Sequence, residues 1–265
     1  MAKSGNPNHD EHGLFASAPG NGASGTPSKG VPDDVAHTFS QVDRSSRYGM
    51  NDAMDSYSKT QYESFTPVQK EAVNFYQASG FRKLNDLAAG RLVADQSYVQ
   101  EMHDALNSVV RSEVVPTDLT LLKGTNRTVE SLTGFPAANA IGKTFSIPSF
   151  ASTTYDQNTA EKFASLGERG GTILSFGVKA GTPGMVIRHQ SESEVVMPPE
   201  SRFTVTSITR DAKGIQVIHC EHIAGNGSTA THKSESSKPR AETPVNSRIN
   251  NDDWLMIHVP DKSKP

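Results

Sequence analysis

The sequence predicts an α+β protein in which helices come first and a mostly antiparallel two-sheet β core follows, with disordered ends. Apolar residues recur at helical spacing up to Pro116. Beyond Pro116 the pattern changes to short strand-like runs that are separated by turn residues. Both ends consist largely of small and polar residues, which bury too little apolar surface to offset the entropy lost on ordering.

These shifts in composition divide the 265-residue chain into four parts. Residues 1–34 are rich in Gly, Ser, Pro and Asn, and we expect them to form a disordered N-terminal segment. Residues 35–223 hold the expected domain, and residues 224–249 have the composition of a flexible linker. Residues 250–265 form a short C-terminal segment around Trp254, apolar enough to dock as a last strand or helical turn.

Three helices are predicted before Pro116. Residues 66–69 (Thr-Pro-Val-Gln) form a capping box with proline at the first helical position, so a helix begins there, and we expect it to end at Gly80. Residues 81–89 indicate a second, short helix. A third begins near residue 97 and places five apolar residues at helical spacing: Val99, Met102, Leu106, Val109 and Val110.

The strands expected after Pro116 are short. The first covers residues 119–123 and is expected to stop at Gly124, and residues 145–154 hold another. A helical turn is expected at 159–163. The remaining predicted strands cover residues 172–178, 184–188, 194–197, 203–210 and 215–222, with a hairpin turn at 211–214 between the last two.

Charge and composition exclude several kinds of protein. The 26 Lys and Arg against 29 Asp and Glu give a net charge of -3, so nothing indicates an electrostatic contact with nucleic acid or an anionic membrane. The single cysteine, Cys220, rules out an internal disulfide, and we expect it to be a small buried residue. No apolar run approaches the ~18–20 residues of a membrane span, and the N-terminus lacks the apolar centre of a signal peptide. We expect a soluble monomer.

A pair of glutamates opens one of the predicted strands. Glu192-Ser193-Glu194 follows a polar loop and leads directly into an apolar run. Residues two apart in a strand face the same side, so both carboxylates can point into one cleft. The alternative, which this motif alone favours, is a solvated pair on an edge strand.

Two further motifs lie upstream of the glutamates. Ser152, Thr153 and Thr154 follow Phe150 at a strand end, where hydroxyls often form ordinary turn hydrogen bonds. Lys123 precedes Gly124, and a lysine at a strand end usually extends its charged group into solvent. Neither motif alone identifies a function.

Taken in chain order, the three motifs resemble the R-S-E class of arginine-type mono-ADP-ribosyltransferases. That pattern is a strand ending in Tyr-Arg-Gly, then Ser-Thr-Ser after an aromatic residue, then Glu-x-Glu opening a strand. The helical block around residues 66–85, with Tyr76 and Leu84-Asn85, is similar to the bacterial toxin and type III effector branch of this family. The resemblance spans residues 65–222 and implies an ADP-ribosyltransferase fold.

The resemblance also implies a reaction, in which ADP-ribose passes from NAD, as substrate, to an arginine of a target protein. Glu194 would stabilise the positive charge that develops on the ribose as the nicotinamide bond breaks. Glu192 would orient and help to deprotonate the acceptor, and Ser152 would hold Glu194 in place. The NAD-binding residues implied are Lys123, Gly124, Ser152 and Thr153.

Lys123 departs from the family pattern, which has arginine at this position. Lysine keeps the charge but lacks the planar fork that binds phosphate with two parallel hydrogen bonds. The loss of one such bond costs ~1.5–3 kcal/mol, or roughly tenfold to a hundredfold in NAD binding. Arg127 would replace the missing fork if the strand continued, but a break at Gly124 argues against this.

Two functions therefore remain in competition. One is an active protein-arginine ADP-ribosyltransferase, and the resemblance implies that it is a virulence effector secreted into a host cell without a classical signal peptide. The other is a binding module with impaired catalysis on the same fold, which the lysine favours. A Ser/His hydrolase is disfavoured because no Gly-x-Ser-x-Gly motif is present, and no metal site is expected because no His-Glu-x-x-His motif occurs.

Overall fold

The computed structural model describes residues 30–42, 47–91, 93–165, 171–187 and 193–223. Within these ranges the chain forms helices followed by a mostly antiparallel sheet, so the predicted α+β class is confirmed. The predicted linker at 224–249 and the segment around Trp254 lie outside the described residues, as do the first 29 residues of the expected N-terminal segment.

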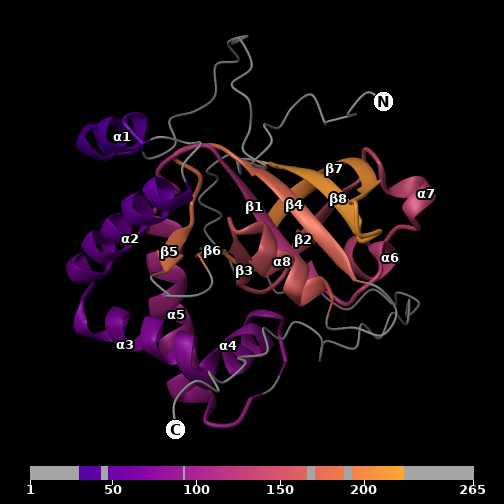
Figure 1. The fold of residues 1–265 in the computed structure, drawn as a ribbon. Coiled ribbons are helices and arrows are strands. Elements are labelled where there is room, and N and C mark those ends of the chain that lie inside the picture. The colour runs from indigo at the N-terminus through magenta and orange to yellow at the C-terminus, as the bar shows by residue number, and fades with distance from the viewer. Residues whose placement is uncertain (1–29, 43–46, 92, 166–170, 188–192, 224–265) are drawn as a thin grey trace, which may run out of the picture.

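Helices make up most of the first half of the described chain (Figure 1). In chain order they are α1 (Asp33–Ser40), α2 (Arg47–Ser64), α3 (Pro67–Phe75), the π-helix η1 (Tyr76–Gly80), α4 (Phe81–Ala88), α5 (Gln96–Ser112), α6 (Val129–Thr133), α7 (Ala137–Ala140) and α8 (Gln157–Ala164).

Eight strands of the described residues form one hydrogen-bonded order, β2-β7-β8-β4-β1-β3-β6-β5. The pairs are antiparallel except for β4 with β8. The strands are β1 (Leu119–Thr125), β2 (Thr144–Ile147), β3 (Ala151–Thr154), β4 (Thr172–Val178), β5 (Met185–Ile187), β6 (Glu194–Met197), β7 (Ser201–Arg210) and β8 (Gln216–His222).

The sequence predicts two sheets, and the structure has two groups of strands that are connected by very few backbone pairs within one strand order. Five strands from β2 to β1 form one group, and β3, β6 and β5 form another. The groups are joined through a single register pair, Leu122 with Thr154, whereas β1 and β4 pair along seven positions. Residues 145–154 consequently hold two strands rather than one, because β2 belongs to the first group and β3 to the second.

The N-terminal helices gather beside the three-stranded group (Figure 1). Helix α5 buries the five apolar residues predicted for its inner face, and these pack with Met185, Ile187 and Val196 of β5 and β6. The capping box at the start of α3 is also confirmed, since the Thr66 side chain accepts a hydrogen bond from the Gln69 backbone and the Gln69 side chain accepts one from Thr66. Alternate residues of β6, Val195 and Met197, pack into a second core on the other face.

One expectation about the helical region was wrong, and one long helix was missed. Gly80 does not end a helix, because its φ of -73° is helical and the chain continues through η1 into α4. A Cβ at this position would lie 2.4 Å from the Phe75 ring, so the glycine allows close packing. Helix α2 was not predicted, since it buries few large apolar residues, among them Met50 and Met54.

Gly124 also has a packing role rather than a terminating one. Strand β1 continues through Gly124 to Thr125, and Gly124 pairs with Ile173 of β4. Helix α8 crosses this strand so closely that a Cβ on Gly124 would lie 1.9 Å from the carbonyl oxygen of Ala160. Only glycine permits that approach.

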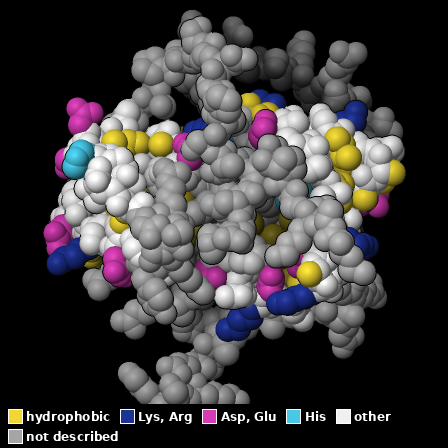
Figure 2. All heavy atoms as spheres, turned by 45° about the horizontal axis from the view of Figure 1, so that its top comes forward, with side chains coloured by type: hydrophobic (Ala, Val, Ile, Leu, Met, Phe, Trp, Pro, Cys, Tyr) yellow, Lys and Arg dark blue, Asp and Glu magenta, His cyan; other side chains and the backbone are white. Residues whose placement is uncertain are grey.

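The surface carries charges of both signs. On the face shown in Figure 2, Lys and Arg side chains of the described residues are interspersed with Asp and Glu side chains. Cys220 is buried, as predicted, and burial raises the pKa of its thiol to about 12. Among the described residues no helix has the length and apolar character needed to cross a membrane.

The contact between β1 and α8 predicts a large effect of adding one methyl group. Gly124→Ala should destabilise the protein by about 3 kcal/mol or more, because the backbone of α8 must move to relieve the overlap. Gly184→Ala is the matched control, since its Cβ would meet only side-chain atoms at 3.3 Å or beyond. Urea unfolding of both variants measures the difference, and equal midpoints would contradict this account of Gly124.

Candidate functional site

Strand β3 is anchored at its start by an aromatic residue. Phe150 is 1% exposed and lies between Tyr76 of η1, at 6.2 Å between ring centroids, and His103 of α5, at 5.4 Å. Edge-to-face and tilted arrangements of this kind are favourable for aromatic rings. The anchor fixes the beginning of β3 against the helices and thereby fixes Ser152 two residues later.

Ser152 and Glu194 meet across two paired strands. Their neighbours set the register, because Ser152 pairs with Val196 and Thr154 pairs with Glu194. The Ser152 hydroxyl donates a hydrogen bond to Oε1 of Glu194, and the two residues are 8% and 6% exposed. A buried carboxylate held by a hydroxyl has a fixed orientation, which is what electrostatic stabilisation of a nearby positive charge requires.

Lys123 lies on β1, in the other strand group, and its side chain extends to Ser152. Its ammonium Nζ donates a hydrogen bond of 3.0 Å to the backbone carbonyl of Ser152, and the residue is 8% exposed. Burial lowers the pKa of this amine to about 8, while Glu194 opposes the shift and Arg127 adds to it. Lys123 is therefore a buried cation close to Glu194, not the solvent-directed lysine that the strand-end position alone suggests.

Arg127 is a second buried cation near Lys123. It follows the end of β1 by two residues, is 7% exposed, and its backbone N–H donates to the Thr125 hydroxyl at 3.3 Å. Its charge contributes to the lowered pKa of Lys123. The break at Gly124 that was expected to separate Arg127 from Lys123 does not occur, because β1 runs past that glycine to Thr125.

The remaining predicted site residues are placed less directly. The Thr153 hydroxyl donates to the Val195 carbonyl at 2.6 Å, on the sheet face opposite Ser152, so its side chain is directed away from Glu194. Gly124 serves the packing of α8. Glu192 lies outside the described residues, and so does the predicted end of the 184–188 strand.

The residue before Glu194 has an unusual backbone that the sequence did not reveal. Ser193 has a φ of 47°, in the left-handed region that non-glycine residues seldom adopt. Its carbonyl accepts a hydrogen bond from the Tyr155 backbone N–H at 3.2 Å. Burial raises the pKa of the Tyr155 phenol to about 12, and a hydrogen bond with Ser193 partly offsets the rise. These contacts with the end of β3 set the direction in which the chain enters β6.

The site thus combines a carboxylate held by a hydroxyl with a buried lysine, at the point where the two strand groups meet. The chain also matches the sequence profile of the ADP-ribosyltransferase exoenzyme family over residues 51–223. The chain belongs to this family. No curated protein matches it in sequence.

Solved structures of bacterial toxins share the fold. The Vis toxin, an ADP-ribosyltransferase from Vibrio splendidus, is 20% identical with a TM-score of 0.51, covering 74% of this chain and 94% of Vis. The Clostridium limosum C3 exoenzyme is 16% identical with a TM-score of 0.51, covering 66% and 95%. The enzymatic component C2-I of the Clostridium botulinum C2 toxin is 16% identical with a TM-score of 0.51, covering 74% of this chain and 47% of C2-I.

The burial of Lys123 predicts an unusual titration. Its side chain should lose a proton near pH 8, and Glu194→Gln should lower that pKa further by removing the charge that favours the ammonium form. NMR of protein with ¹³C-labelled lysine measures both values, and the Lys123 signal is assigned by its loss in Lys123→Arg. A Lys123 titration near 10.5 would contradict the buried environment.

Proposed function

We propose that this protein transfers ADP-ribose from NAD to an arginine of a target protein. The observation that carries the proposal is the buried Ser152–Glu194 hydrogen bond with Lys123 beside it. A buried carboxylate without a function is costly to keep, because its charge must be compensated. The Glu194 carboxylate of β6, the Ser152 hydroxyl of β3 and the Lys123 ammonium of β1 lie close together, and this convergence of three strands supports a catalytic role.

The reaction requires the protein mainly to stabilise charge and to position the two substrates. The bond between the nicotinamide nitrogen and C1′ of the ribose breaks, and its electron pair leaves with nicotinamide. Positive charge develops on the ribose, and the carboxylate of Glu194 stabilises it. An arginine nitrogen then forms the new bond to C1′ and gives up a proton. The resemblance to the arginine-type class assigns the receipt of that proton to Glu192.

Lys123 and Arg127 supply the positive charge that a diphosphate needs. Both are buried and lie near Glu194, so a bound diphosphate would interact with two cations in a setting where charges interact more strongly than in water. Lysine at the position of the motif arginine therefore belongs to the site, and this favours the enzyme over a binding module with impaired catalysis.

Only membership of the family supports the place of action that we propose. Exoenzymes and toxins of this fold act outside the producing cell, and we propose the same for this chain, with a host protein as target. The motif Glu-x-Glu supports arginine as the acceptor, because the first carboxylate can pair with a guanidinium through two parallel hydrogen bonds.

The central role of Glu194 predicts a specific loss. Glu194→Gln keeps the size and the hydrogen-bonding oxygen but removes the charge, so transfer of labelled ADP-ribose to agmatine, a small guanidine acceptor, should fall roughly 10²–10³-fold. NAD binding should be largely retained, since the carboxylate acts mainly in the transition state.

The matched control is Glu221→Gln, an exposed glutamate of β8, which should leave transfer unchanged. Equal activity of Glu194→Gln and the wild type would overturn the catalytic role of Glu194. Labelling of a different acceptor type in place of agmatine would overturn the arginine preference.

A further inference from the structure

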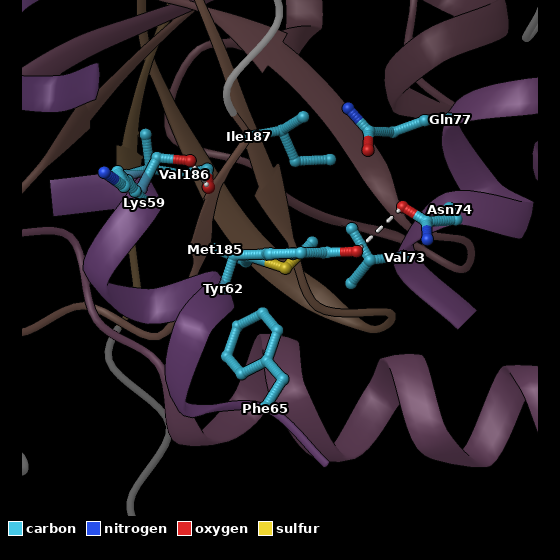
Figure 3. A pocket seen from close by; sticks show the side chains of 10 residues that line it. Lys59, Tyr62, Phe65, Val73, Asn74, Gln77, Met185, Val186 and Ile187 are labelled. Carbon is cyan, nitrogen blue, oxygen red and sulfur yellow. Dashed lines mark hydrogen bonds between the residues drawn. The ribbon is translucent and has the colours of Figure 1, made fainter. Parts of the chain in front are cut away.

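A cavity of about 210 Å³ lies between helix α2, helix α3 with η1, and strand β5 (Figure 3). Its buried lining is mostly apolar, with Ser58 as the polar member; the apolar members are Phe65, Val73, Met185, Val186 and Ile187. Asn74, which is exposed, and Gln77, which is half-buried, line it where it meets the surface.

A hydrogen bond links two walls of the cavity. Tyr62 extends across the cavity in Figure 3, and its hydroxyl donates to Oδ1 of Asn74 at 3.2 Å. This bond links α2 to α3. The cavity floor is fixed as well, because Ser58 of α2 donates to the carbonyl of Val186 in β5 at 2.9 Å. The cavity is therefore built into the fold.

The cavity lies one strand beyond the catalytic carboxylate. Ile187 of β5 pairs directly with Glu194 of β6, and paired residues project to the same face of a sheet. Met185, Ile187 and Val196 all pack on this face against the helices. The Glu194 carboxylate and the cavity thus share one face, with strands ~4.8 Å apart.

Size and charge decide between possible occupants. Pockets that hold ligands of drug size measure ~300–1,000 Å³, so this cavity is too small for a dinucleotide. A guanidinium would be buried most favourably beside a carboxylate, and no Asp or Glu is among the described residues that line the cavity. The lining does include Lys59, an exposed cation that would repel a guanidinium. A single apolar side chain, like the anchor residues of protein–protein interfaces, fits both the volume and the apolar part of the lining.

We propose that the cavity binds an apolar side chain of the target protein, located within a few residues of the acceptor arginine. The inference rests on the proposed transfer to arginine. An extended chain advances ~3.3–3.6 Å per residue, so an anchor in the cavity corresponds to roughly one to three residues from the arginine beside Glu194. The anchor selects protein substrates over free guanidine compounds by lowering KM.

Synthetic peptides test this directly. Each contains one arginine in a Gly/Ser chain, with a single leucine placed from four residues before to four residues after it, and matched peptides carry serine instead. At one spacing, leucine should raise kcat/KM of the wild type about tenfold over the serine peptide. Agmatine labelling and NAD hydrolysis without acceptor are measured in parallel.

Two tryptophan variants distinguish binding in the cavity from binding to the surface around it. Gln77→Trp blocks the cavity where it meets the surface and should reduce the advantage of leucine to less than about twofold, with agmatine labelling maintained. Ala78→Trp is the matched control, because Ala78 is exposed, adjacent in the chain and outside the lining. It should keep the full advantage.

The outcomes distinguish failure of the cavity proposal from failure of the proposed transferase activity. If agmatine is labelled but leucine gives no advantage at any spacing, or the advantage persists in Gln77→Trp, the cavity proposal is wrong and the transferase proposal stands. Equal losses of peptide labelling, agmatine labelling and NAD hydrolysis in Gln77→Trp would place the cavity in the NAD site and overturn the proposal. If the wild type neither hydrolyses NAD nor labels agmatine, the proposed function fails and the cavity proposal fails with it.

Discussion

The site depends on the hydrogen bond between Ser152 and Glu194, because it links β6 to β3, the strand through which the three-stranded group meets the rest of the sheet at one register pair. Phe150 fixes β3 against the helices, and the left-handed backbone of Ser193 sets the entry into β6. The positions of both hydrogen-bonding residues are therefore set by contacts outside the bond itself.

Electrostatics is the basis of our proposal that the site where the two strand groups meet binds a charged substrate. Lys123 and Arg127 are both buried near Glu194, and burial lowers the pKa of Lys123 to about 8. A lysine in this position is protonated at neutral pH but loses its proton in mildly alkaline solution, unlike an arginine. The exchange of the motif arginine for lysine thus leaves a cation whose charge depends on pH, with Arg127 as a permanent charge close by.

The sequence predicted the elements whose burial follows a simple period, such as the inner face of α5, and those with specific capping chemistry, such as the start of α3. It also predicted that Ser152 and Glu194 belong to one site. The sequence prediction failed where a glycine is needed for a packing contact. Gly80 and Gly124 were both expected to end an element, but each lies so close to a neighbouring group that a Cβ would overlap with it. The burial of Arg127 and the cavity beside β5 depend on packing between segments far apart in the chain, which no local pattern encodes.

Calorimetric titration with NAD tests the central claim, that Lys123, Ser152 and Glu194 form an NAD site, most directly. At pH 7 the wild type should bind NAD with a saturable heat at one site per chain. At pH 9.5 Lys123 has lost its proton, so wild-type affinity should fall, whereas Lys123→Arg should bind equally well at both values of pH. The absence of any heat at millimolar NAD, or an identical pH dependence of the two proteins, would contradict the account.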